Sequence, residues 1–160
     1  MKNPKKILEY TKELNLLYVE DDKSMQKRSV EMFSNFFDNI TTADNCQEGL
    51  DLYNKSSFDI VITDISMPKM DGIELNQNIR QYNPSIPIIV FSAWNDSTNM
   101  SACISLDIDA YMLKPLDSSN LIDALYKVYL KVKNNREIFK KVWYWQTDKF
   151  IINYMKIFQN

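Results

Sequence analysis

Four apolar runs in the sequence each end at side chains that can do chemistry. Two runs end in carboxylates, one ends in a hydroxyl group and one ends in a primary amine. The residues are Glu20 and Asp21 after 16–19, Asp64 after 58–63, Ser92 after 86–91, and Lys114 after 108–113. In an open α/β sheet, sites form beyond the carboxyl ends of the strands. The pattern therefore predicts that these side chains meet at one edge of a sheet.

Glu20, Asp21 and Asp64 would bring three carboxylates together at that edge. Three close negative charges repel, so such a site either raises carboxyl pKa values or binds a cation. Hard oxygen ligands that leave room for water suit Mg²⁺, with Mn²⁺ as an alternative. The acidic residues therefore predict a divalent cation site.

The composition excludes several other kinds of chemistry. The chain has no histidine, which removes Ser-His-Asp and Cys-His catalysis and histidine-containing zinc sites. Two cysteines cannot complete a structural zinc site, and two glycines cannot form a Gly-rich phosphate loop. Two cysteines are also too few for a disulfide framework, and no apolar run has the length of a membrane span or follows the pattern of a signal peptide. These features predict a cytoplasmic protein.

Strand-like and helix-like segments alternate along the chain. Strands are expected at 15–19, 40–43, 58–63, 86–91 and 108–113, and helices at 4–11, 22–37, 45–55, 72–82, 95–105 and 117–132. Asn45 is expected to cap the third of these helices, with Glu48 completing a capping box. Alternation of this kind predicts an α/β fold with a doubly wound, five-stranded parallel sheet and helices on both faces.

The charge changes sign near residue 132. Residues 1–130 hold 12 basic and 19 acidic side chains, whereas residues 131–160 hold 7 basic and 2 acidic ones. The change predicts an N-terminal arm or short helix at 1–13, a main domain at 14–132 and a basic, aromatic extension at 133–160. Two aromatic and aliphatic runs in the extension flank a polar stretch at 146–149, which indicates a β-hairpin. The hairpin would begin a longer effector, and the alternative is an amphipathic extension that packs on the domain or on a second copy.

Several short motifs, taken together, resemble the receiver domain of bacterial two-component response regulators, of the kind found in chemotaxis. The motifs are the pair Glu20-Asp21, Asp64 followed by Met67-Pro68-Lys69-Met70-Asp71-Gly72, Ser92-Ala93, and Tyr111 three residues before Lys114-Pro115. Each motif is weak alone, but their order and their positions at strand ends are specific. The resemblance covers residues 14–132 and implies the flavodoxin-like strand order 2-1-3-4-5, which periodicity does not give.

The resemblance implies roles for the residues at the strand ends. Asp64 would be the phosphoacceptor, and Lys114 and Ser92 would contact phosphoryl oxygens. The Mg²⁺ ligands would be Asp21, Asp64 and the backbone carbonyl of Ser66, with Glu20 acting through a bound water. The site would thus transfer a phosphoryl group to a carboxylate with the help of Mg²⁺.

Other residues would regulate this chemistry, again by resemblance. Ser92 and Tyr111 would form the switch that responds to phosphorylation. Ser66 and Trp94 lie at positions that modulate the lifetime of the acyl phosphate. The peptide bond between Lys114 and Pro115 would be cis, which turns the lysine toward the acidic site.

These observations favour a signalling receiver that takes part in its own phosphorylation and dephosphorylation, rather than an enzyme with a diffusible substrate. The donor would be a phosphohistidine of a sensor histidine kinase or phosphotransfer protein, because this chain has no histidine. One alternative is a Mg²⁺-dependent phosphohydrolase, although Ser66 stands where such enzymes usually place a second acid. Another is a scaffolding pseudo-receiver, which the intact Asp21, Asp64 and Lys114 disfavour. The output partner is not identified. A homodimer is one option, DNA binding requires a further effector, and no membrane contact is expected.

Overall fold

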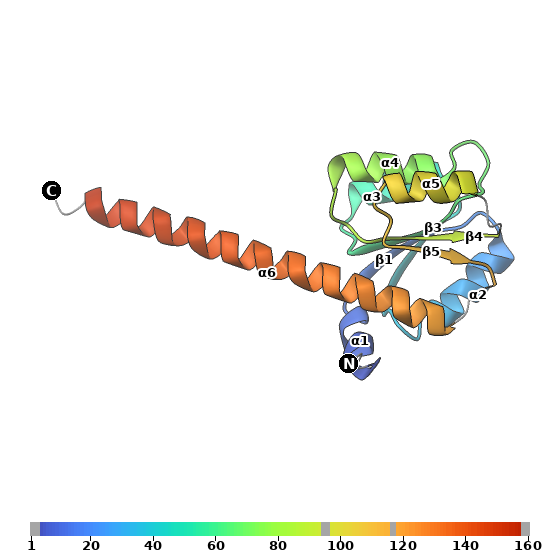
Figure 1. The fold of residues 1–160 in the computed structure, drawn as a ribbon, viewed down its shortest axis with the longest axis horizontal. Coiled ribbons are helices and arrows are strands. Elements are labelled where there is room, and N and C mark those ends of the chain that lie inside the picture. Colours follow the sequence, from blue (N-terminus) through green and yellow to red (C-terminus); the bar gives the residue numbers. More distant parts are fainter. Residues whose placement is uncertain (1–3, 94–96, 116–117, 158–160) are drawn as a thin grey trace.

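The structure is a computed structural model that describes residues 4–93, 97–115 and 118–157. The strands are β1 (Asn15–Val19), β2 (Asn39–Ala43), β3 (Ile60–Asp64), β4 (Ile88–Ser92) and β5 (Ala110–Leu113). The helices are α1 (Pro4–Thr11), α2 (Lys23–Phe33), α3 (Cys46–Lys55), α4 (Gly72–Tyr82), α5 (Ser97–Ser105) and α6 (Ser118–Ile157). The sheet is parallel with the order β2-β1-β3-β4-β5 (Figure 1), which confirms the expected α/β fold.

Helices cover both faces of the sheet, and each face has its own core (Figure 1). Along β1, successive side chains alternate between faces, as the period of two in a strand requires. Leu16 and Tyr18 enter the core that α1, α2 and α6 close, whereas Leu17 and Val19 enter the core beneath α3, α4 and α5. Both cores extend to the carboxyl edge of the sheet, where the polar residues at the strand ends lie.

Helix starts near this edge follow the sequence. Asn45 caps α3 by accepting the Glu48 N–H at 2.9 Å, as expected, and Asp71 caps α4 in the same way. The capping box differs in one detail, because the Glu48 carboxylate accepts the N–H of Asp44 and not that of Asn45. The predicted N-cap of α5 at 95–96 lies outside the described residues.

Several boundaries differ from the expectation, and β4 and β5, like β3, start two residues late. α2 ends at Phe33 and not at residue 37, because the Ser34 and Asn35 side chains bond back to helix carbonyls and the chain tightens into a turn. The apolar pattern predicted a longer helix because Phe36 and Phe37 fit it. Both side chains are buried, but they lie in the turn that follows the helix. β3 starts at Ile60, two residues later than expected, and it includes Asp64.

The predicted hairpin in the C-terminal extension is wrong. α6 continues through Ile157 as a single helix of 40 residues. The segment 118–157 contains no glycine and no proline, the two residues that break helices most strongly, so the helix can continue through it. Beyond its contacts with the domain, α6 projects away from the sheet (Figure 1). Among the described residues, no helix combines the length and the apolarity needed to cross a bilayer.

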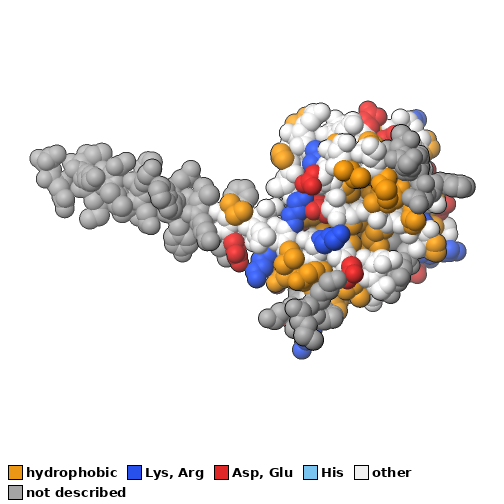
Figure 2. All heavy atoms as spheres, viewed as in Figure 1, with side chains coloured by type: hydrophobic (Ala, Val, Ile, Leu, Met, Phe, Trp, Pro, Cys, Tyr) orange, Lys and Arg blue, Asp and Glu red, His pale blue; other side chains and the backbone are white. Residues whose placement is uncertain are grey.

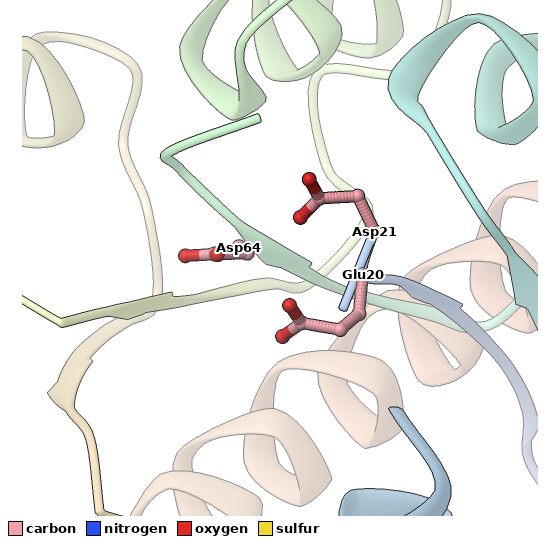
Figure 3. A group of neighbouring side chains, drawn as sticks. All are labelled: Glu20, Asp21 and Asp64. Carbon is pink, nitrogen blue, oxygen red and sulfur yellow. The ribbon is translucent and has the colours of Figure 1, made fainter. Parts of the chain in front are cut away.

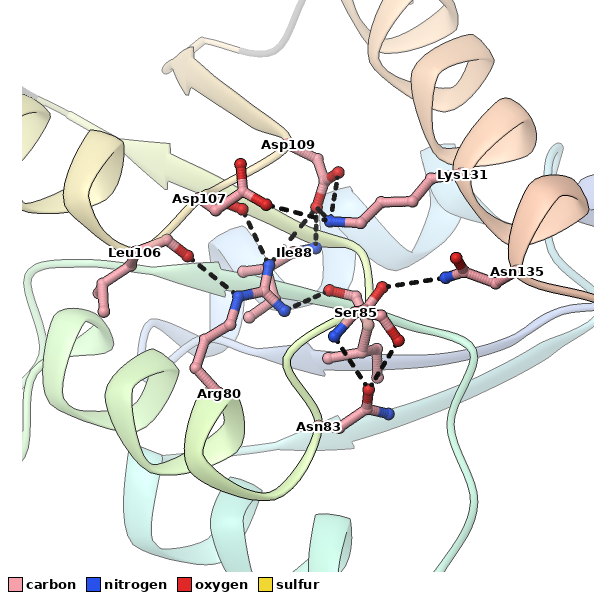
Figure 4. Close-up of polar contacts among 10 residues, drawn as sticks. Arg80, Asn83, Ser85, Ile88, Leu106, Asp107, Asp109, Lys131 and Asn135 are labelled. Atoms are coloured by element: carbon pink, nitrogen blue, oxygen red, sulfur yellow. Dashed lines mark hydrogen bonds and ion pairs between the residues drawn. The ribbon is translucent and has the colours of Figure 1, made fainter. Parts of the chain in front are cut away.

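The amino ends of β4 and β5 are tied to α6 by a network that we call the amino-edge clamp, formed by Arg80, Ser85, Asp109, Lys131 and Asn135 (Figure 4). Asp109 accepts the N–H of the first β4 residue at 2.9 Å and pairs with the Lys131 ammonium at 2.9 Å. Arg80 lies 3.6 Å from the same carboxylate, and the Asn135 amide donates to the Ser85 carbonyl at 3.4 Å. The clamp fixes the direction in which α6 leaves the domain.

Helix α1 braces the same stretch of α6 from another side. Tyr10 packs edge-to-face on Tyr129 with ring centroids 4.9 Å apart. The Arg136 guanidinium lies 5.6 Å from the Tyr10 ring centroid and 3.3 Å from the Asp59 carboxylate. Asp59 also accepts the N–H of Asn15 at the start of β1. Contacts between α6 and the domain therefore continue past residue 132, where the charge changes sign.

Candidate functional site

Three carboxylates meet at the carboxyl edge of the sheet (Figure 3). Oxygen atoms of Glu20, Asp21 and Asp64 lie within 4.8 Å of one another. The register explains the meeting, because Val19 is paired with Thr63 and the residues that follow them emerge side by side. Glu20 and Asp64 are only 1% and 6% exposed, whereas Asp21 is exposed to solvent. The donor set is all oxygen, which fits a hard cation such as Mg²⁺.

Lys114 supplies the positive charge of this cluster. Its ammonium lies 2.7 Å from Glu20 Oε2 and 3.1 Å from Asp64 Oδ2. Its backbone N–H donates to the Ser92 carbonyl at 2.8 Å, and the peptide bond to Pro115 is cis, as the resemblance implied. The lysine therefore reaches the acids from a backbone that is itself fixed to the end of β4.

Burial and ion pairing have opposite effects on the pKa values of Glu20 and Lys114. Burial raises the pKa of the Glu20 carboxyl group above its ordinary value, although the hydrogen bond from Lys114 opposes the shift. Burial alone would lower the pKa of the Lys114 ammonium, but the hydrogen bond to Glu20 and the charge of Asp64 outweigh it and raise that pKa. Lys114 is thus held as a cation beside Asp64.

The backbone around Asp64 is equally well defined. Asp64 Oδ1 accepts the N–H of Ile65 at 2.8 Å, so both carboxylate oxygens have a donor. The loop then folds back until the Gly72 N–H donates to the Ile65 carbonyl at 3.0 Å. A Cβ at Gly72 would lie 2.1 Å from the Asp64 carbonyl oxygen. Glycine is required here by the close approach of two backbone segments.

The remaining predicted residues lie at or near the same edge. Ser92 ends β4 and is 1% exposed, and Tyr111 on β5 is half-buried against the core beneath α3, α4 and α5. Ser66 is exposed two residues after Asp64, and the role of its carbonyl stays a prediction. Trp94 lies outside the described residues.

The structure adds two residues that the sequence reasoning missed. The Tyr18 hydroxyl donates to Glu20 Oε2 at 3.1 Å. The Gln26 amide donates to the carbonyls of Glu20 and Ala43 at 3.0 and 3.1 Å, which joins the β1 end to the β2 end. The period of two along β1 could have identified Tyr18, because it lies two residues before Glu20. No comparable signal marks Gln26.

An open cleft of about 620 Å³ borders the exposed side of the cluster at Asp21. The cleft lies between the loops that follow β1, β2 and β3. Its walls include Asp44, Asn45, Pro68, Lys69 and Glu74. Of the three carboxylates, Asp21 lines this cleft, whereas Glu20 and Asp64 are buried.

Comparison with known proteins agrees with this geometry. Residues 16–126 match the family described as response regulator receiver domain. The chain is 35% identical over 123 residues to the probable C4-dicarboxylate response regulator DctR of Bacillus subtilis, covering 74% of this chain and 54% of that protein. It is 30% identical over 116 residues to the transcriptional regulatory protein GlrR of Escherichia coli, covering 72% of this chain and 25% of that protein. The chain thus spans about a quarter to a half of the length of these relatives.

Solved structures give the same result. The N-terminal domain of an uncharacterised Wolinella succinogenes protein superposes with a TM-score of 0.69 at 29% identity, covering 76% of this chain and 98% of that one. A CheX-CheY-BeF3-Mg²⁺ complex from Borrelia burgdorferi gives a TM-score of 0.67 at 30% identity, covering 72% of this chain and 89% of the matched chain. The motifs, the sheet order and the family match agree, and the chain belongs to the response regulator receiver domain family.

Proposed function

We propose that Asp64 is the phosphoacceptor of this receiver and that its phosphorylation depends on Mg²⁺. The observation that carries the proposal is the contact of Lys114 with both Glu20 and Asp64, beside the exposed carboxylate of Asp21. An amine and three acids at one sheet edge can bind a cation and a phosphoryl group together. The relative from B. burgdorferi, solved with BeF3 and Mg²⁺, supports the assignment.

The chain's own residues would perform the transfer as follows. A carboxylate oxygen of Asp64 attacks the phosphorus of a phosphohistidine, the new O–P bond forms as the P–N bond breaks, and the electron pair leaves with the imidazole. Lys114 and Ser92 would contact the phosphoryl oxygens. Asp21, Asp64 and the Ser66 carbonyl would hold Mg²⁺, which supplies charge neutralisation at the phosphoryl oxygens. Glu20 would act through a bound water.

The donor histidine would lie outside residues 1–160, because these residues contain no histidine. A sensor histidine kinase or a phosphotransfer protein has the required chemistry, and the open cleft at Asp21 would let it approach that side of the acidic cluster. Self-phosphorylation from small phosphodonors is expected as well, since the proposed catalytic groups all lie in the receiver. One named relative is a transcriptional regulatory protein, so DNA binding would require a further effector in a longer protein.

Phosphorylation would be read on the face formed by α5, β5 and α6. Tyr111 lies on β5, and a groove of about 680 Å³ runs beside it between β5 and α6. Hydrophobic side chains gather on this face (Figure 2), where Ile104 is 75% exposed and Leu113 is 47% exposed. Movement of Ser92 toward the phosphoryl group would free space for Tyr111 to turn inward and change this surface.

Acetyl phosphate tests the proposal directly. In the presence of Mg²⁺, the protein should gain the mass of one phosphoryl group, measured on the intact chain. Hydroxylamine should remove the group, because it cleaves acyl phosphates and not phosphoesters. Labelling that survives chelation of the metal would contradict the role of Mg²⁺.

Within the acidic pair, Asp21 should matter more for Mg²⁺ than Glu20. We expect Asp21→Ala to weaken Mg²⁺ binding about 100-fold and Glu20→Ala only about tenfold, because Asp21 would bind the cation directly and Glu20 through water. Calorimetric titration of both variants measures the difference. Equal or reversed losses would show that the two roles are wrongly assigned.

The end of the receiver is proposed to lie after the contacts of Arg136, later than the change of charge suggests. Truncation after Ile138 should leave labelling and melting temperature unchanged. Truncation after Lys133 removes the Asn135–Ser85 and Arg136–Asp59 contacts and should lower the melting temperature by about 2–5 °C without abolishing labelling. Equal melting temperatures for the two truncations would mean that these contacts contribute nothing.

A further inference from the structure

Behind the acidic cluster lies a buried line of polar groups that the proposed chemistry does not use. Tyr18 is completely buried in the core that α1, α2 and α6 close, and its ring packs edge-to-face on Phe33 with centroids 5.0 Å apart. Its hydroxyl nevertheless reaches Glu20 Oε2 at 3.1 Å. Ser29 on α2, itself only 3% exposed, is a second hydrogen-bond partner of the same hydroxyl.

The direction of these bonds follows from the groups themselves. Burial raises the pKa of Tyr18, so its hydroxyl keeps its proton. A carboxylate can only accept, and a tyrosine hydroxyl has one hydrogen, so Tyr18 donates to Glu20 and accepts from Ser29. The line continues through Lys114, which lies 2.7 Å from Glu20 Oε2 and 3.1 Å from Asp64. Helix α2 is thereby connected to the acceptor carboxylate by consecutive hydrogen bonds and ion pairs.

The two oxygens of Glu20 are treated differently by the protein. Oε2 receives both side-chain donors, Tyr18 and Lys114, whereas Oε1 receives only the backbone N–H of Asp22 at 3.4 Å. A glutamate has one more rotatable bond than an aspartate, so its carboxylate needs external contacts to hold one orientation. Two donors on Oε2 fix that oxygen and leave Oε1 for the cation side.

One of those donors has a second task in the proposed function. When Lys114 contacts a phosphoryl oxygen on Asp64, it can no longer hold Glu20 as closely. Tyr18 then remains as the side-chain donor on Oε2. The hydrogen bond from Tyr18 therefore contributes most to the orientation of Glu20 when cation and phosphoryl group are both present.

We propose that Tyr18 is a positioning residue for cation binding, and that its hydroxyl orients Glu20 so that this carboxylate serves the Mg²⁺ site. The inference rests on the proposed function, because it assigns Tyr18 to the same site. The inference predicts that the Tyr18 hydroxyl affects Mg²⁺ affinity only through its hydrogen bond to Glu20.

Calorimetric titration with Mg²⁺, without any phosphodonor, tests this in the full chain. Tyr18→Phe keeps the buried ring and removes only the hydroxyl, and it should weaken Mg²⁺ binding about threefold to tenfold. Tyr10→Phe is the matched control, because the Tyr10 hydroxyl is buried without a hydrogen-bond partner among the described residues. That control should bind Mg²⁺ as the wild-type protein does.

A double-mutant cycle separates positioning from general packing. Glu20→Asp withdraws the carboxylate by about 1.5 Å, one carbon–carbon bond, which takes it out of reach of the hydroxyl. In the Glu20→Asp background, Tyr18→Phe should therefore cause no further loss of affinity. For Tyr18→Phe alone, the rate of labelling by acetyl phosphate should fall more at low Mg²⁺ than at saturating Mg²⁺.

Each other outcome overturns the inference. An unchanged affinity in Tyr18→Phe, or a lower melting temperature without loss of affinity, would show that the hydroxyl is only structural. An equal loss in the Glu20→Asp background would show that Tyr18 acts by another route. Failure of the wild-type protein to bind Mg²⁺ would overturn the proposed cation site and this inference with it. Normal binding by the wild type with an unchanged affinity in Tyr18→Phe would overturn this inference alone.

Discussion

Asp64→Asn should abolish the addition of a phosphoryl group from acetyl phosphate. The amide has nearly the shape of the carboxylate, so the contacts with Ile65 N–H and Lys114 can be kept in part while the nucleophilic oxygen is lost. Transfer of this kind depends on an attacking oxygen in line with the leaving group, and no neighbouring group replaces it without moving. The expected result on intact protein is no added mass under conditions that label the wild type fully.

The matched control is Asp51→Asn, the same change at an exposed residue of α3. It should be labelled at the wild-type rate. Unchanged labelling of Asp64→Asn would show that Asp64 is not the phosphoacceptor. Residual labelling that resists hydroxylamine would point to a hydroxyl side chain and not to a second carboxylate.

Gly72→Ala should destabilise the fold by about 3 kcal/mol, at the upper end of what overpacking usually costs. The added Cβ would lie 2.1 Å from the Asp64 carbonyl oxygen and 3.0 Å from the Asp64 carbonyl carbon and from Ile65 Cα. These are backbone atoms next to the acceptor, so relief requires the loop after β3 to move. Urea unfolding should show a lower midpoint with an unchanged slope. Labelling should slow as well, because the same loop carries Ser66.

Gly49→Ala is the natural comparison. Its Cβ would meet side-chain atoms of Val19 at 2.8 and 3.3 Å and of Ala43 at 3.7 Å. Side chains can adjust more easily than backbone, and alanine in a helix interior is favoured over glycine by about 1 kcal/mol. A much smaller loss of stability is therefore expected. If the two variants were equally stable, the close backbone approach at Gly72 would be contradicted.

Much of the site was predictable because its residues end strands. Asp64, Lys114 and the acidic pair each follow an apolar run, and parallel strands bring their carboxyl ends to one edge. The side chains that hold these groups were less visible. Gln26 joins the ends of β1 and β2 beside the site, and at the opposite edge of the sheet Asp109 accepts the N–H of a residue 21 positions away. Neither contact leaves a periodic signal.

The extension shows where local pattern fails. Its aromatic and β-branched residues favour strands, but a hairpin also needs a turn that glycine, asparagine or proline commonly provides. The stretch 146–149 contains none of these and only Asp148 as a weaker turn residue, and the helix that begins at Ser118 continues through it. Strand propensity alone therefore gave the wrong element, and the absence of a turn was the more informative feature.

The amino-edge clamp gives α6 the mechanical properties of a lever. Lys131 holds α6 to Asp109, and Asp109 precedes β5, the strand that carries Tyr111 and leads to Lys114. From Arg136 to Ile157 the helix extends about 32 Å, so a tilt of about 10° at the clamp would displace its far end by about 6 Å. A small shift of β5 would thereby be converted into a large movement outside the domain. The state of the receiver can then be read as the direction of a rod, for which the distance between labels on α6 and on the sheet is the appropriate measurement.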